Sequence, residues 1–220
     1  MMLLATPVRG LDSTAGIILA GGLSRRMGGG DKCLRLLGGR PLVSHVIRRL
    51  EGQVARLALN ANGDPSRFST FGLPVIPDAT ADFAGPLAGV LAGLRWAAKA
   101  TPQARFIATA ACDTPFFPVN FVQVLLGSTK GAYPCLALAA SAGRVHPVFA
   151  LWPIALADDL ALSLQAGTRK VLGWTERHPH VITEFAFTSF GENVADPFFN
   201  ANTPEDLAEA ERLLAKDKMP

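Results

Sequence analysis

Along the first half of the chain, apolar residues follow two patterns that alternate with each other. Short apolar runs typical of buried strands lie at 16–20, 54–60, 73–76 and 106–111. Apolar positions at helical spacing predict helices from Pro41 to just before Gly52, over 86–100 and over 119–126. Strands that alternate with helices favour an α/β fold, with a mostly parallel sheet covered by helices on both faces.

The second half departs from this alternation. Strands are predicted at 133–139 and 148–151, joined around 141–144, and again at 180–187. Helices are predicted over 153–165, over 169–177 and after Thr203, which serves as the N-cap with Pro204 in the first helical position. We expect one domain over 15–220, preceded by a loose N-terminal tail at 1–14.

Composition places the chain among globular proteins. Hydrophobic residues make up 49% of its 220 residues, and charged residues only 18%, which suits a full core and disfavours disorder. Cys33, Cys112 and Cys135 match neither a zinc pattern nor a disulfide framework, so we expect free thiols and a cytoplasmic location. The chain has no apolar run long enough for a membrane span and no basic start typical of a signal peptide, so we expect no membrane association.

Positive charge is concentrated near the N-terminus. The formal net charge is only +3, but seven Arg or Lys residues and one acid, Asp31, lie between Gly21 and Leu50. Such a local field attracts an anionic ligand. With one Tyr in the chain and no basic run interleaved with aromatic residues, nucleic acid is not the expected partner.

The strand at 16–20 leads directly into a loop rich in glycine and positive charge. Its notable members are Gly21, Gly22, Arg25, Arg26, Gly28, Gly29, Gly30 and Lys32. Glycine allows the backbone to approach a ligand closely, and successive N–H groups can cradle an anion. Arginine and lysine add donors suited to phosphate. The loop therefore predicts a triphosphate cradle; the alternative is a glycine-rich surface turn with solvated arginines.

Polar residues follow three of the other predicted strands. They are Asn60, Asp78 and Asp113. In open parallel sheets, ligands bind outside the carboxyl ends of the strands, so we expect one shared crevice. Alternatively, each of these residues serves as a helix cap or turn former, Asp113 before Pro115 among them.

The glycine loop lacks both the P-loop and the dinucleotide fingerprint. Residues 19–32 instead resemble the signature L-A-G-G-x-S-x-R-M-G-x-x-[DK]-K of the nucleotidyltransferases. Within these enzymes, the chain is most similar to the molybdenum cofactor guanylyltransferases, which join GMP to molybdopterin. The resemblance runs from Gly16 to Leu213 and implies a three-layer, Rossmann-like nucleotidyltransferase fold.

The resemblance also implies a reaction and the residues that perform it. GMP would pass from GTP to molybdenum-molybdopterin with release of pyrophosphate, and Mg²⁺ would be the cofactor. The expected nucleotide contacts are Leu19, Ala20, Gly21, Gly22, Lys32, Asn60, Asp78 and Asp113. Arg25, Lys32 and Asp113 are the expected catalytic residues, and Asp113 is also the expected metal ligand, because a carboxylate that ends a buried strand is rigidly held.

The acceptor side rests on fewer residues. Arg144 and His146 lie in a segment similar to one that lines the molybdopterin face of the family, although His146 also fits a simple strand-end residue. Asn200 and Asn202, beside the N-T-P-E segment, are candidates for the metal or the pterin. An accessory GTP-binding protein, a molybdenum insertion protein and apo-molybdoenzymes are candidate partners.

Three other functions stay open at this point. A cytidylyltransferase of the molybdenum cofactor, or a sugar- or alditol-phosphate nucleotidyltransferase, would share the glycine loop. A non-catalytic carrier of a nucleotide cofactor belongs to another class, and such a protein would have little use for Lys32 and Asp113 together.

Overall fold

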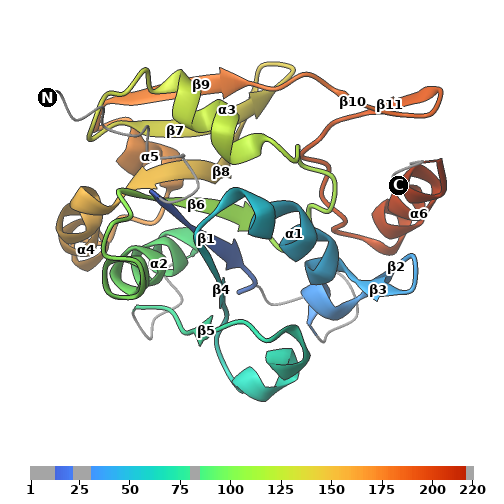
Figure 1. The fold of residues 1–220 in the computed structure, drawn as a ribbon, viewed down its shortest axis with the longest axis horizontal. Coiled ribbons are helices and arrows are strands. Elements are labelled where there is room, and N and C mark those ends of the chain that lie inside the picture. Colours follow the sequence, from blue (N-terminus) through green and yellow to red (C-terminus); the bar gives the residue numbers. More distant parts are fainter. Residues whose placement is uncertain (1–12, 22–30, 80–84, 217–220) are drawn as a thin grey trace, which may run out of the picture.

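A seven-stranded sheet runs through the middle of the protein in the order β5-β4-β1-β6-β8-β7-β9 (Figure 1). The computed structural model describes residues 13–21, 31–79 and 85–216. The strands of the sheet are β1 (Thr14–Leu19), β4 (Arg56–Asn60), β5 (Val75–Ile76), β6 (Phe106–Ala111), β7 (Leu136–Ser141), β8 (Arg144–Pro153) and β9 (His180–Glu184). β8 is antiparallel to both of its neighbours, and the other pairings are parallel. The predicted mostly parallel sheet is confirmed.

Helices cover both faces of this sheet. The α-helices of the described residues are α1 (Leu42–Leu50), α2 (Pro86–Ala100), α3 (Phe121–Ser128), α4 (Ala157–Gln165), α5 (Val171–Thr175) and α6 (Pro204–Lys216). α1 and α3 lie on one face, and α2, α4 and α5 lie on the other (Figure 1). This three-layer, Rossmann-like arrangement confirms the expected fold class. Within the described residues, no helix is long and apolar enough to cross a membrane.

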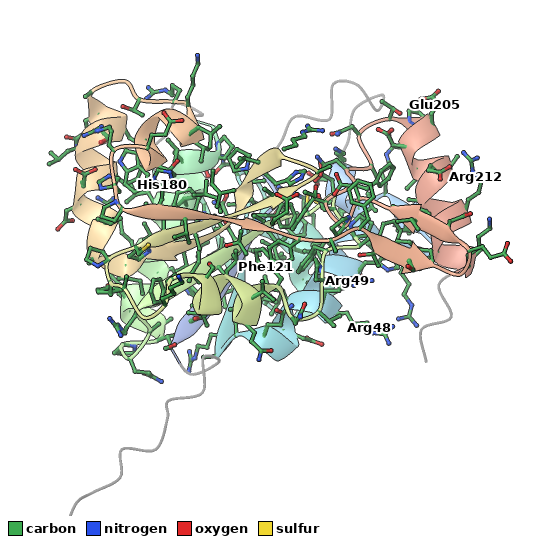
Figure 2. The ribbon with its side chains drawn as sticks, turned by 90° about the horizontal axis from the view of Figure 1, so that it is seen from above. Arg48, Arg49, Phe121, His180, Glu205 and Arg212 are labelled. Atoms are coloured by element: carbon green, nitrogen blue, oxygen red, sulfur yellow. The ribbon has the colours of Figure 1, made fainter. Side chains whose placement is uncertain are left out.

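The two faces of the sheet bury separate apolar clusters. Neighbouring residues of β1 point to opposite faces, so Ile18 packs with α1 and α3, whereas Ile17 packs with α2. Phe121, labelled near the centre of Figure 2, belongs to the first cluster and is fully buried. Burying each such side chain contributes about 1.5–3 kcal/mol to folding.

A third apolar cluster attaches the C-terminal part of the chain. Two short hairpins contribute to it, β2–β3 (Leu36–Leu37 and Arg40–Pro41) and β10–β11 (Thr188–Phe190 and Asn193–Ala195). Leu213 of α6 packs there with Leu37, Phe116 and Phe190. Figure 2 shows His180, at the start of β9, near one end of the long axis and Arg212 of α6 near the other. The C-terminal segment therefore crosses the molecule and ends beside β2–β3 (Figure 1).

Most of the predicted elements are present, with differences at their ends. The predicted bounds of α2 and β6 agree with the structure, and β1 begins at Thr14, the last residue of the predicted tail. The helix predicted from 153 divides into a 3₁₀ turn at Ile154–Leu156 followed by α4. The β10–β11 hairpin and the 3₁₀ helix η4 (Pro65–Phe71) were not predicted, because such short elements carry almost no periodicity.

Close contact between α2 and the sheet gives a test of this arrangement. A Cβ added at Gly93 would lie 2.6 Å from Ile17 Cγ1 and 3.1 Å from Ile107 Cδ1, both in the core. We expect Gly93→Ala to lower the free energy of unfolding in urea by about 1–3 kcal/mol, because the fully packed core must shift. At the control position Gly127, in α3, a Cβ meets nothing within 4 Å. There alanine should be neutral or stabilise by up to about 1 kcal/mol; equal stability of the two variants would contradict the prediction.

Candidate active site

The carboxyl ends of β4, β1 and β6 lie side by side. Leu19, the last residue of β1, pairs with Asn60 of β4 on one side and with Ala111 of β6 on the other. The N–H of Ala20 donates to Asn60 O at 2.8 Å, and the N–H of Cys112 donates to Leu19 O at 3.2 Å. Residues far apart in the sequence therefore meet at one edge of the sheet, as predicted.

Lys32 and Asp113 form an ion pair at this edge. Lys32 is the first residue of the 3₁₀ helix η2 (Lys32–Leu34), and Asp113 follows β6 by two residues. Lys32 Nζ contacts Asp113 Oδ2 and also donates to Asn202 Oδ1. The two charged side chains are only 16% and 19% exposed, so water screens their attraction less than it would at the open surface. The structure thus brings together three residues that the sequence proposed separately.

Backbone and side-chain bonds hold the C-terminal segment against Asp113. The N–H of Ala201 donates to Asp113 O at 2.9 Å. The hydroxyl of Thr114 donates to Asn200 Oδ1 and lies 3.3 Å from Asp113 Oδ1. The N–H groups of Asn202 and Thr203 both donate to Asp206 Oδ2 at 2.9 Å, which fixes the start of α6. Asn200 and Asn202 are therefore held in place by the end of β6 and by the start of α6.

The oxygen atoms near Asp113 suit a divalent cation that is bound mainly by a substrate. Among the described residues, no group of three or more His, Cys, Asp or Glu side chains could hold a metal by itself. The partly exposed Asp113 carboxylate has amide oxygens of Asn200 and Asn202 around it. Mg²⁺ is typically held by one or two carboxylates together with phosphate oxygens and water. The donor set fits such an ion and does not form a complete protein cage.

A second polar cluster lies at the ends of β4 and β5. Asn60 Nδ2 donates to Asp78 Oδ1 at 3.0 Å, and Asn62 Nδ2 donates to Asp78 Oδ2 at 2.7 Å. The N–H of Asp78 returns a 2.8 Å bond to Asn62 Oδ1. A Cβ at Gly89 of α2 would lie 2.2 Å from Asn60 Oδ1, so only glycine leaves room for this buried amide. Among the described residues, each Asp78 oxygen accepts one side-chain hydrogen bond, which leaves a lone pair on each for a ligand.

His146 belongs to a third polar group, on the β7–β8 side of the sheet. Its Nε2 lies 2.7 Å from Ser141 Oγ, and Ser141 Oγ donates to Asp196 Oδ1 at 2.8 Å. Burial lowers the pKa of His146 more than the nearby Asp196 raises it, so the neutral ring is favoured. Since the serine proton goes to Asp196, the network assigns the remaining imidazole proton to Nε2. Asp196 binds the serine and not Nδ1, which differs from a Ser-His-Asp catalytic triad.

Of the remaining predicted residues, some lie within the described part of the chain and others lie outside it. Arg144 begins β8 and is exposed, while Gly21 is exposed directly after the end of β1. Leu19 and Ala20 make backbone bonds to the neighbouring strands, and Gly21 follows them at the same sheet edge. Their nucleotide contacts stay predictions. Gly22 and Arg25 lie outside the described residues, and their roles stay predictions.

Several residues of these clusters were missed from the sequence. Asn62 follows Asn60 by two residues in the same polar loop, which was the one available signal. Thr114, Ser141 and Asp196 gave none, because the bonds from Thr114 to Asn200 and from Ser141 to Asp196 join residues 86 and 55 positions apart. Cys33 and Cys112 are buried free thiols next to Lys32 and Asp113 in sequence. A hydrogen bond with Cys33 and burial both raise the pKa of Cys112 well above its ordinary value, so this thiol adds no charge to the site.

Known proteins share both the sequence and the fold. Residues 16–181 match the family described as "MobA-like NTP transferase domain". A molybdenum cofactor guanylyltransferase from Rhodopseudomonas palustris (strain BisB5) is 51% identical over 212 residues, which cover 96% of this chain and 99% of that protein. One from Mesorhizobium japonicum is 51% identical over 201 residues, 91% of this chain and 95% of that protein.

A solved structure supports the same fold at lower identity. Molybdopterin-guanine dinucleotide biosynthesis protein A from Archaeoglobus fulgidus superposes with a TM-score of 0.69 at 24% identity, covering 92% of this chain and 99% of that one. The family match extends over most of the chain, and the two relatives match it almost from end to end. The chain therefore belongs to the MobA-like NTP transferase family and, within it, to the molybdenum cofactor guanylyltransferases.

Proposed function

We propose that this nucleotidyltransferase transfers GMP from GTP to molybdenum-molybdopterin, which yields the guanine dinucleotide form of the cofactor and pyrophosphate. The observation that carries the proposal is the Lys32 ammonium group held by Asp113 and Asn202 at the ends of the central strands. The names of the relatives at about 51% identity support the choice of substrates.

The reaction is a displacement at the α-phosphorus of GTP. A terminal phosphate oxygen of the acceptor forms the new P–O bond, and the bond to the bridging oxygen of the β-phosphate breaks with its electron pair leaving on pyrophosphate. A phosphate monoester is already ionised near neutral pH, so the step needs no general base. The protein's task is to align two anions and to stabilise the charge of the transition state.

Lys32 suits this task because, among the described residues, its ammonium group has two acceptors for its three donors. Of its three N–H bonds, one is directed to Asp113 and one to Asn202, which leaves the third for a phosphate oxygen. Asp113 would hold Mg²⁺, assisted by amide oxygens of Asn200 and Asn202. When bound, the ion neutralises phosphate charge and acts as a Lewis acid.

Asp78 would recognise the base at the other end of the nucleotide. Guanine presents two adjacent donors, N1–H and the N2 amino group, and a carboxylate accepts such a pair with its two oxygens. Asp78 is held for this role by Asn60 and Asn62. Adjacent strands lie about 4.8 Å apart, so β4 and β6 are separated by roughly 10 Å, which suits a base over β4 and phosphates over β6.

We expect Lys32→Ala to weaken GTP binding and to lower kcat/KM by about 10²–10³-fold, because the transition-state charge loses its fixed cation. Lys99→Ala, which removes an exposed lysine from the last turn of α2, is the control and should leave both values unchanged. GTP binding is measured by calorimetry and turnover by pyrophosphate release. If both variants behave alike, Lys32 is not part of the site.

We expect Asp113→Asn to abolish the Mg²⁺-dependent turnover, because the neutral amide is a poor ligand for a hard cation. Turnover is measured across a Mg²⁺ titration, and circular dichroism checks that the fold is intact. A variant that folds normally and keeps the wild-type Mg²⁺ response would exclude Asp113 as the metal ligand.

The reaction itself is tested by pyrophosphate release from GTP and Mg²⁺, with and without molybdenum-molybdopterin supplied by a carrier protein. We expect release from GTP only when the acceptor is present, and at least tenfold less from CTP because cytosine lacks the paired donors. Preference for CTP would identify a cytidylyltransferase. Absence of release with this acceptor would contradict the proposal and direct the search to sugar phosphates.

A further inference from the structure

Arg67 contacts both halves of the candidate nucleotide site, Asp31 beside Lys32 and Asn62 beside Asp78. It lies on η4, next to the fully buried Phe68. Its guanidinium group donates to Asp64 O at 2.6 Å and to Asn62 O at 2.5 Å. Its Nε lies 2.6 Å from Oδ2 of Asp31, with side chains 25% and 29% exposed. The contact with Asp31 is mainly one between charges, because this Nε–H makes no aligned hydrogen bond.

These contacts tie Lys32 to the base side of the site. Asp31 directly precedes Lys32, and Asn62 holds the Asp78 carboxylate. On the other side of the glycine-rich segment, Ala20 is bonded to Asn60 O. The chain before Gly21 and the chain at Asp31 are therefore both attached to the same part of the protein, the β4–η4–β5 unit.

The charge of Asp31 gives Arg67 a second role. Asp31 is the one acid among the residues from Gly21 to Leu50, where the positive field for the triphosphate is concentrated. A free carboxylate next to Lys32 would repel the phosphates and compete for the ammonium group. The guanidinium group of Arg67 compensates this charge while its two other bonds keep it in place.

We propose that Arg67 is a positioning residue that holds and neutralises Asp31, so that Lys32 is available to the triphosphate of the bound nucleotide. The inference rests on the proposed function only for the choice of GTP as the nucleotide. It adds a residue of η4 to the determinants of triphosphate binding.

The test compares the dissociation constants of Mg²⁺·GTP and of GMP, measured by calorimetry for Arg67→Ala, Asp31→Asn and the double variant. GMP lacks the β- and γ-phosphates and serves as the reference for base and ribose binding. We expect Arg67→Ala to raise the Kd of GTP about tenfold and that of GMP less than about twofold. We expect Asp31→Asn to raise the Kd of GTP by less than about threefold. The double variant should show the same small increase as Asp31→Asn and not the tenfold increase of Arg67→Ala, because it has no unpaired carboxylate.

Two further variants separate positioning from stability. Arg67→Lys keeps the charge but not the forked donors, so it should recover part of the GTP affinity. The matched control is Arg212→Ala, which removes an exposed ion pair with Glu209 (2.7 Å) on α6 and should change neither Kd. Thermal unfolding of each variant identifies any loss of fold. Asp31→Asn is a mild change in a partly exposed side chain. Its Kd values for GTP and GMP can therefore be interpreted even if Arg67→Ala folds poorly.

Two results would overturn the inference. Equal weakening of GTP and GMP by Arg67→Ala would mean a general structural role, and additive losses in the double variant would mean that Arg67 does not act through Asp31. The measurement needs no acceptor, so it stands apart from the guanylyl-transfer reaction. If the wild type prefers another nucleoside triphosphate, the same comparison applies to that nucleotide and its monophosphate, and the guanine assignment alone fails.

Discussion

The ammonium group of Lys32 is the point at which three distant parts of the chain are held together. It joins the short helix after the glycine-rich segment, the end of β6 and the residues before α6, through Asp113 and Asn202. Partly buried charges of this kind are stable only when each has a partner, because removing one leaves the other desolvated and unpaired. In the proposed function, the same arrangement offers a fixed cation to the triphosphate and a carboxylate to its metal ion.

The surrounding architecture keeps this ion pair in place. α6 contributes no charge to the pair, yet its apolar face packs with Leu37 and Phe116, near η2 and near the end of β6. Asp206 fixes the backbone of Asn202, and Ala201 is bonded to Asp113. The match to the family model spans residues 16–181, so the amide of Asn202 that binds Lys32 lies outside that span. The C-terminal segment thus completes the site from outside the sheet.

The hydrogen bonds and charges around Arg67 connect the ion pair of Lys32 to the proposed base side of the site. Asp78 is bonded to Asn60 and Asn62, and Asn62 is bonded to Arg67, whose charge faces Asp31. These contacts give the proposed base side and the proposed phosphate side a common frame. β1 lies between them as the central strand, with its end bonded to both β4 and β6.

Local patterns determined the elements and the chemistry that depends on neighbours in sequence. The period of the apolar residues predicted β6 and α2, and Thr203 with Pro204 predicted the start of α6, because each depends on residues a few positions apart. The placement of Asn60, Asp78 and Asp113 after strands also predicted their common edge. Only the tertiary structure decided that Lys32 contacts both Asp113 and Asn202, that Arg67 faces Asp31, and that Ser141 joins His146 to Asp196. Such pairs depend on strand order and on how loops cross the sheet edge, and no periodic pattern along the chain records which distant side chains will meet there.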